Sequence, residues 1–122
     1  PPFEIGIPAL DRISLVQKEA FSEVIKPYRD QIRHLFFGHI HRPLSGSWLG
    51  IPISSLRGMN HQLQLDMTDR SLQGNFEPPA YCVVLFRDDT LIVHTHDFMD
   101  SSPKFDVARS PVQDWAVMKP YS

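Results

Sequence analysis

One stretch near the start of the chain carries apolar residues at helical spacing. It covers residues 15–26, and polar side chains occupy the opposite face. The apolar positions are Val16, Ala20, Phe21 and Val24. Ser14 followed three residues later by Gln17 is typical of a capping box, and Pro27 is expected to end the helix. The proline-containing segment 1–13 predicts an extended loop with a short turn at 9–13.

The rest of the chain alternates short apolar runs with turn residues, a pattern that predicts strands. The expected strands are 32–37, 47–49, 51–56, 61–66, 81–86 and 90–98. The first of these is apolar enough to be buried on both faces, and a loop over 38–46 follows it. Asp88-Asp89 joins the last two strands into a hairpin. One main helix followed by a mostly antiparallel sheet predicts an α+β fold.

Composition narrows the classes of function. The 122 residues have a formal net charge of −2, which excludes nucleic-acid or anionic-membrane binding driven by net charge. No apolar run reaches the ~20 residues of a membrane span. The one cysteine, Cys82, excludes an internal disulfide framework and fits a reducing compartment, so we expect a cytoplasmic protein. Cys82 lies within a predicted strand, where core packing is a simpler role than that of a nucleophile.

Two of the candidate chemical motifs are His-x-His pairs. His94-Thr95-His96 falls within a predicted strand, where alternate side chains share a face. Both imidazoles could therefore meet one metal ion. The alternative is a pair of histidines on the solvent face, and it is favoured because two ligands alone make a poor site.

The second pair, in Gly38-His39-Ile40-His41, follows directly on a predicted strand. We expect Gly38 to allow a sharp turn out of that strand, because glycine adopts positive φ without steric cost. In such a turn the two imidazoles can spread apart and reach two different ions, as in sites that hold two metals ~3.5–4 Å apart for phosphoryl transfer. The alternative is two ordinary loop histidines.

Several segments in the same order resemble the calcineurin-like metallophosphoesterase superfamily. Within it, the chain resembles the class III cyclic-nucleotide phosphodiesterase and glycerophosphodiesterase branch. The segment 35–43, Leu-Phe-Phe-Gly-His-Ile-His-Arg-Pro, resembles the last metal motif of that family. The other matching segments are Pro1-Pro2-Phe3, Gly6-Ile7-Pro8 with Leu10-Asp11, His61-Gln62 with Leu65-Asp66, and Glu77-Pro78-Pro79-Ala80-Tyr81 with the hairpin after it.

The resemblance implies a role for each matching residue. His39 would ligate one divalent ion and His41 the other, with Gly38 as the turn glycine. Arg42 and His61 would face the substrate or support the ligands, although ordinary loop side chains are the simpler interpretation of both. The cofactors implied are two divalent metal ions (Mn, Fe or Zn), and the fold implied is two sheets flanked by helices. His34 has no counterpart in the family motifs, and its place in a buried strand predicts a structural role.

Other motifs of the family do not occur in this sequence. The family carries Asp-x-His, Gly-Asp and Gly-Asn-His motifs before this region, and a histidine just before the Pro-Pro. We therefore expect residues 1–98 to be the C-terminal part of a metallophosphoesterase domain, and 99–122 to be an extended C-terminal tail. The chain alone would have a partial or empty metal site and would be inactive or nearly so.

Two functions follow from these observations. The first is a contribution to phosphodiester hydrolysis, with a cyclic-nucleotide-like or glycerophosphodiester substrate in the intact enzyme. The alternative is a non-catalytic β-rich association module, because removing half of a sandwich exposes an apolar sheet face that a partner normally covers. The expected partners are then a second copy of the chain, as a homodimer or oligomer, or the missing N-terminal half. Neither nucleic acid nor membrane is expected.

Overall fold

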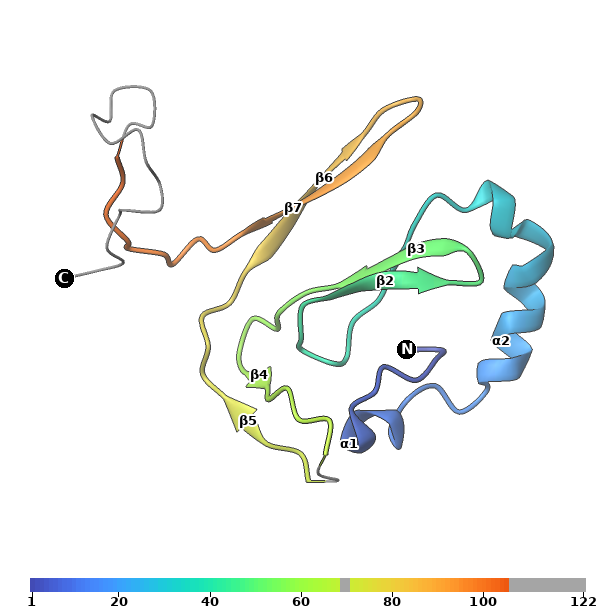
Figure 1. The fold of residues 1–122 in the computed structure, drawn as a ribbon, viewed down its shortest axis with the longest axis horizontal. Helices are drawn as coiled ribbons and strands as arrows, with labels where there is room; N and C mark the ends of the chain where they lie inside the picture. Colours follow the sequence, from blue (N-terminus) through green and yellow to red (C-terminus); the bar gives the residue numbers. More distant parts are fainter. Residues whose placement is uncertain (69–70, 106–122) are drawn as a thin grey trace.

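The computed structural model describes residues 1–68 and 71–105, and it confirms an α+β fold (Figure 1). In chain order the elements are α1 (Pro8–Asp11), α2 (Lys18–Ile25), the 3₁₀ helix η1 (Lys26–Gln31), β1 (Leu35–Phe36), β2 (Leu44–Trp48), β3 (Ile51–Ser55), β4 (Gln62–Leu63), β5 (Gly74–Asn75), β6 (Tyr81–Phe86) and β7 (Leu91–His96). The strands form three small sheets, in the orders β1-β3-β2, β4-β5 and β6-β7.

The three-stranded sheet has β3 at its centre. β1 pairs with β3 in parallel, and β2 pairs with β3 in antiparallel fashion. β2 and β3 are joined by a tight turn at Leu49 (φ 53°) and Gly50 (φ 82°). Two successive residues of positive φ are typical of the hairpin turn whose twist matches that of its strands. Pro52 is tolerated in β3 because β1 pairs only with Ile53 and Ser54, so the chain at Pro52 has β2 alone as a neighbour.

The core brings the N-terminal loop against the segment that follows β1. Its buried members are Ile7, Leu10, Ile40 and Leu63, with Ile5, Phe37 and Leu44 packed around them. The carboxylate of Asp11 accepts hydrogen bonds from the backbone N–H of Ile5 (2.7 Å) and of Gly6 (3.1 Å), and these fold the loop back onto α1. Because Ile40 is fully buried in this cluster, the core fixes the position of the residues on either side of it.

The helix predicted over residues 15–26 begins later than the sequence indicates. α2 begins at Lys18, and its N-cap residue is Gln17, without a side-chain cap. The capping box expected at Ser14 does not form, because the Ser14 hydroxyl donates to the carbonyl of Asp11 at the end of α1 (2.8 Å). The α-helix ends before Pro27 as expected, but the chain continues as η1, in which Pro27 occupies the first turn.

α2 lies at the edge of the molecule (Figure 1), and none of its residues is buried. Phe21 stacks on Trp48 of β2, with ring centroids 5.9 Å apart, and Phe3 lies against the same indole at 5.7 Å. In contrast, Val24 is 64% exposed, and Val16, just before the helix, is 92% exposed. The predicted apolar stripe exists, but only Phe21 among its larger members is substantially packed.

The β6-β7 hairpin extends away from the central sheet, as Figure 1 shows. The sequence predicted β6 with the observed bounds, and it placed β7 over 90–98, slightly longer than observed. Arg33 ties the hairpin turn to the rest of the chain: its Nη2 donates to the carbonyls of Arg87 and Thr90, at 2.6 Å each. Alternate β6 residues Tyr81, Val83 and Leu85 leave an exposed apolar face on this hairpin.

Three predictions about the strands are wrong. The strand expected over 32–37 is only β1, and Phe36 is exposed rather than buried, because among the described residues β1 has a single neighbouring strand. The loop expected over 38–46 ends early, since β2 begins at Leu44 and extends through the predicted 47–49. The strand expected over 61–66 shortens to β4, whose partner β5 gave no sequence signal.

Residues 101–105, within the tail predicted over 99–122, contain neither helix nor strand. The remainder of the predicted tail, 106–122, lies outside the described residues. Over the described part of the chain, every helix is too short and too polar to cross a bilayer.

Candidate metal centre

The His39-Ile40-His41 turn combines a buried anchor with two unusual backbone conformations. His39 has φ 75° and His41 has φ 47°, both in the left-handed region. For residues with a Cβ this region costs about 1–2 kcal/mol each, and such residues gather at functional sites. Between them, Ile40 is fully buried and packs with Ile7 and Leu10. The core therefore holds the turn in place and presents one imidazole on each side of Ile40.

Gly38 does not play the part expected of it. Its φ lies outside the left-handed region, and a Cβ built on it would meet no described atom within 4 Å. The sharp turn is made by His39 and His41 themselves. The sequence therefore placed the turn correctly but assigned the positive φ to the wrong residue.

His41 is half-buried and makes one directed polar contact. Its Nδ1 lies 2.9 Å from the backbone carbonyl oxygen of His61, and the two rings lie 4.6 Å apart at 51°. Because a carbonyl oxygen can only accept, Nδ1 carries the proton in this hydrogen bond. The lone pair of His41 is then on Nε2, the nitrogen available to a metal ion.

His39 is exposed and shares a cavity of about 360 Å³ with His41. The cavity lies between the His39–His41 turn, the segment after β3 and the start of β6, and its other lining residues are Phe37, Gly38, Leu56, Arg57, Gly58, Met59, Ala80 and Tyr81. Arg57, which the sequence did not single out, brings a positive charge to the wall. Its Nη1 pairs with the carboxylate of Asp97, and its buried Nε has no hydrogen-bond partner among the described residues.

The predicted substrate residues Arg42 and His61 are not among the residues that line the cavity shared by His39 and His41. Arg42 Nη1 donates to the carbonyl of Leu63 (3.1 Å) and lies 3.7 Å from a carboxylate oxygen of Glu77. These contacts direct the guanidinium toward β4 and bridge it to the segment before β6. His61 contacts His41 through both its carbonyl and its ring. A role toward substrate stays a prediction for both residues.

Two further residues near His41 were missed by the sequence analysis. Gln62 is 1% exposed, and its side-chain amide makes two hydrogen bonds with the backbone of Gly58. The N–H of Gly58 donates to Gln62 Oε1 (2.8 Å), and Gln62 Nε2 donates to the Gly58 carbonyl (2.7 Å). Gln62 appeared in the sequence analysis only within the matching segment His61-Gln62, without a role, and Gly58 did not appear, because the two residues meet through a loop closure rather than through a regular element.

Two imidazoles that line one cavity are of the ligand type that suits divalent metals of the first transition row. The described residues do not complete such a site: they contain no group of three or more His, Cys, Asp or Glu side chains placed to hold a metal ion. The His94 and His96 side chains on β7 are both exposed, and the His96 ring lies against Tyr81 with centroids 4.9 Å apart.

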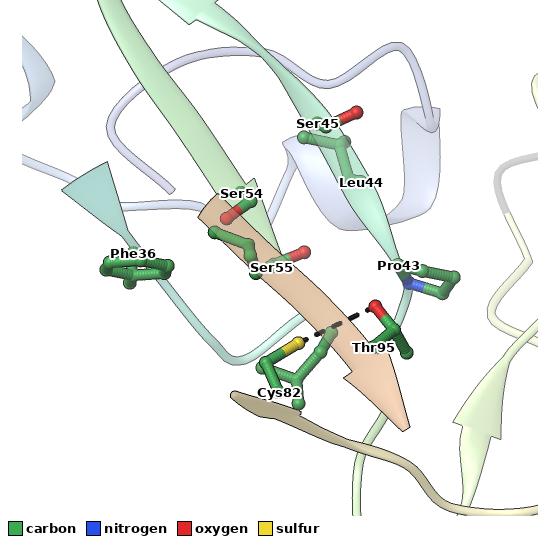
Figure 2. A pocket seen from close by; sticks show the side chains of 10 residues that line it. Phe36, Pro43, Leu44, Ser45, Ser54, Ser55, Cys82 and Thr95 are labelled. Carbon is green, nitrogen blue, oxygen red and sulfur yellow. Dashed lines mark hydrogen bonds between the residues drawn. The ribbon is translucent and has the colours of Figure 1, made fainter. Parts of the chain in front are cut away.

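A second cavity, of about 340 Å³, separates the three-stranded sheet from the hairpin (Figure 2). Its walls are apolar and hydroxyl side chains together with Cys82, whose Sγ lies 3.7 Å from the hydroxyl oxygen of Thr95. None of its lining residues is charged, so it offers nothing to balance the charge of a phosphodiester. Behind it, His34 hydrogen-bonds through Nε2 to Ser54 Oγ (2.7 Å) and stacks on Phe36.

Comparison with known proteins finds a relative similar to most of this chain. No protein-family model matches the chain. The sequence is 40% identical over 106 residues to a probable cyclic nucleotide phosphodiesterase of Rhodopseudomonas palustris (strain ATCC BAA-98 / CGA009). The alignment covers 86% of this chain and 38% of that protein, so the chain spans well under half the length of its relative. Most of this chain is therefore similar to one part of a protein named as a phosphodiesterase.

Proposed function

We propose that this chain forms part of a binuclear-metal-dependent phosphodiesterase of the calcineurin-like superfamily, to which it contributes His39 and His41 as metal ligands. The observation that carries the proposal is the His39-Ile40-His41 turn, where two histidines take left-handed conformations on either side of a fully buried isoleucine. The similarity to a probable cyclic nucleotide phosphodiesterase supports it independently.

In this proposal each residue near the cavity has a distinct task. His41 binds one ion through Nε2, because Nδ1 is held by the His61 carbonyl. His39 binds the second ion from the other side of Ile40. Two divalent ions, Mn, Fe or Zn, would supply Lewis-acid stabilisation of the charge that develops on the phosphoryl group. Arg57 also lines the cavity, where its guanidinium is paired with the carboxylate of Asp97.

The substrate class follows from the charge of the site and from the relative. A phosphodiester carries one negative charge, which histidine-bound metal ions would balance. The name of the relative favours a cyclic nucleotide, and a glycerophosphodiester remains the second substrate class in this proposal. Two ligands make a weak and open site, so we expect turnover by this chain alone to be close to background.

The experiment has two stages. The intact mass of the natural polypeptide is first compared with 14.0 kDa, and a substantially larger mass is expected. Hydrolysis of 3′,5′-cyclic AMP and of glycerophosphocholine is then measured with Mn²⁺ in that polypeptide. His39→Ala and His41→Ala should each lower kcat/KM by roughly 100-fold or more, while the control His94→Ala should not. Undiminished hydrolysis in the first two variants would contradict the proposal.

Association is a second candidate, favoured by the uncovered apolar surface. Tyr81 and Val83 on β6 are each 45% exposed, and Val16 and Val24 near α2 are more exposed still. Apolar faces of this kind are normally covered by a partner. We propose a second copy of the chain as that partner, through the hairpin. Sedimentation equilibrium should then show a dimer that Val83→Lys dissociates and Glu4→Lys does not; a monomer at all concentrations would contradict it.

A further inference from the structure

We propose that Gly58 and Gln62 act as a clamp that sets the tautomer of His41, by holding the His61 carbonyl against Nδ1. The clamp makes Nε2 the nitrogen that faces a ligand. Neither residue would touch metal or substrate, so both are positioning residues. The choice of metal as the ligand rests on the proposed function, whereas the tautomer is a property of the chain itself.

The hydrogen bond at His41 determines which ring nitrogen is protonated. The His61 carbonyl oxygen lies 2.9 Å from His41 Nδ1 and has no proton to give. An imidazole free of such a contact populates both neutral tautomers. Histidines that bind metals usually donate their other ring N–H to a carbonyl or carboxylate, which orients the ring and raises the basicity of the ligating nitrogen. The arrangement at His41 matches that pattern within a single chain.

The His61 carbonyl is itself held from both sides. Ahead of it, the Asn60 side chain accepts the His61 N–H (2.9 Å). Beyond it, the buried amide of Gln62 closes the loop by bonding to both backbone groups of Gly58, at 2.8 and 2.7 Å. Gln62 is 1% exposed, so water does not compete well for these bonds. The loop 58–62 is therefore a rigid support for one carbonyl oxygen.

Gly58 is required for space and not for its backbone conformation. Its φ is not in the left-handed region. A Cβ built on Gly58 would lie 2.7 Å from His41 Nδ1, 2.8 Å from the His61 carbonyl oxygen and 2.9 Å from His41 Cγ. All three distances are shorter than atoms tolerate. A methyl group at position 58 would thus push apart the two atoms of the proposed hydrogen bond.

Long-range ¹H–¹⁵N NMR of the histidine rings tests the clamp without any metal. In the metal-free chain, above the pH at which histidines titrate, His41 should show the Nδ1–H form. Gly58→Ala and the volume-conserving Gln62→Met should shift it toward Nε2–H or a mixture, with the backbone fingerprint otherwise retained. Gly46→Ala is the matched control, because its Cβ would meet only the Ile53 side chain, at an ordinary 3.8 Å. Nε2–H in the wild-type chain, or Nδ1–H in both variants, would overturn the proposal.

Calorimetric titration with Zn²⁺ separates this proposal from the proposed function. If both hold, Gly58→Ala and Gln62→Met should weaken Zn²⁺ binding by roughly 10–100-fold, while Gly46→Ala should not. If the tautomer shifts as expected but the natural polypeptide binds no Zn²⁺, the clamp is supported and the metal proposal fails. If Zn²⁺ binds equally well to all three variants, the clamp has no role in metal binding and that part is overturned.

Discussion

His34 Nε2 lies 2.7 Å from Ser54 Oγ, so a side chain just before β1 is joined to the strand with which β1 pairs in parallel. The imidazole also stacks on Phe36, with ring centroids 4.2 Å apart. Partial burial lowers the pKa of His34 below its ordinary value, because desolvation disfavours the charged imidazolium. This contact therefore couples the stability of the central sheet to pH.

The sign of that coupling follows from the direction of the shift. With the pKa of His34 lowered in the folded state, the unfolded chain binds more protons as pH falls through about 6.5, the ordinary histidine value. The free energy of unfolding should therefore decrease on acidification through this range. Urea unfolding of His34→Gln, which keeps a polar partner for Ser54, should show a smaller decrease than wild type. The exposed control His94→Gln should behave like wild type; equal pH dependence in all three proteins would contradict the account.

Ile40 should be the most sensitive apolar position in the His39–His41 turn. It is fully buried against Ile7 and Leu10, so Ile40→Ala loses packing and leaves a cavity. We expect a loss of about 2–5 kcal/mol in the free energy of unfolding, measured with urea. Ile92→Ala on the hairpin is the control, since Ile92 is 40% exposed and should cost far less. Similar costs at the two positions would show that Ile40 does not anchor the turn.

In the β2-β3 turn, we expect substitutions at two neighbouring residues to change the free energy of unfolding in opposite directions. Leu49 and Gly50 both have positive φ, a conformation that asparagine and glycine adopt more readily than leucine does. Leu49→Asn should stabilise the chain by up to about 1 kcal/mol. Gly50→Ala should destabilise it by about 1–2 kcal/mol. Thermal unfolding measures both, and a stabilising Gly50→Ala would rule out this turn geometry.

Arg33 should control the mobility of the β6-β7 hairpin. Its guanidinium donates to two carbonyls at the hairpin turn and lies over Phe86, 6.0 Å from the ring centroid. Arg33→Met should therefore speed amide hydrogen exchange in β6 and β7 with little effect in β2 and β3. Arg29→Met is the control, because Arg29 pairs only with its exposed neighbour Asp30 among the contacts described. Unchanged exchange in the hairpin would contradict this role.

The sequence was most informative where local pattern and tertiary pairing agree. β6 and β7 are rich in β-branched and aromatic residues, pair with each other and are joined by a short turn, so neighbours along the chain suffice to define them. The start of β2 was missed because Leu44, Ser45 and Gly46 carry no strand pattern of their own and are held in a strand by antiparallel pairing with β3. β5 depends on its partner β4, twelve residues earlier, and has no pattern of its own.

In the candidate site, too, the sequence identified the residues with local features and gave no role to those that loop closure brings in. His39 and His41 were found because their spacing and their position after a strand are local features. Arg57, Gly58 and Gln62 reach the site through loop closure, about twenty residues away from the histidines, and their residue types carry no signal by themselves. Gly38 shows the limit of a local argument, since the left-handed conformations fell on the histidines beside it.

The two His-x-His pairs of this chain allow one direct test of metal binding at the His39–His41 turn. Zn²⁺ binding is titrated by calorimetry in the natural polypeptide, in its His39→Ala/His41→Ala double variant and in its His94→Ala/His96→Ala double variant. The pairs have the same spacing, but one lies on a core-anchored left-handed turn and the other on an exposed strand. We expect the first double variant to lose Zn²⁺ binding and the second to retain it. Retained binding in the first variant, or its loss only in the second, would contradict a metal site at the His39–His41 turn.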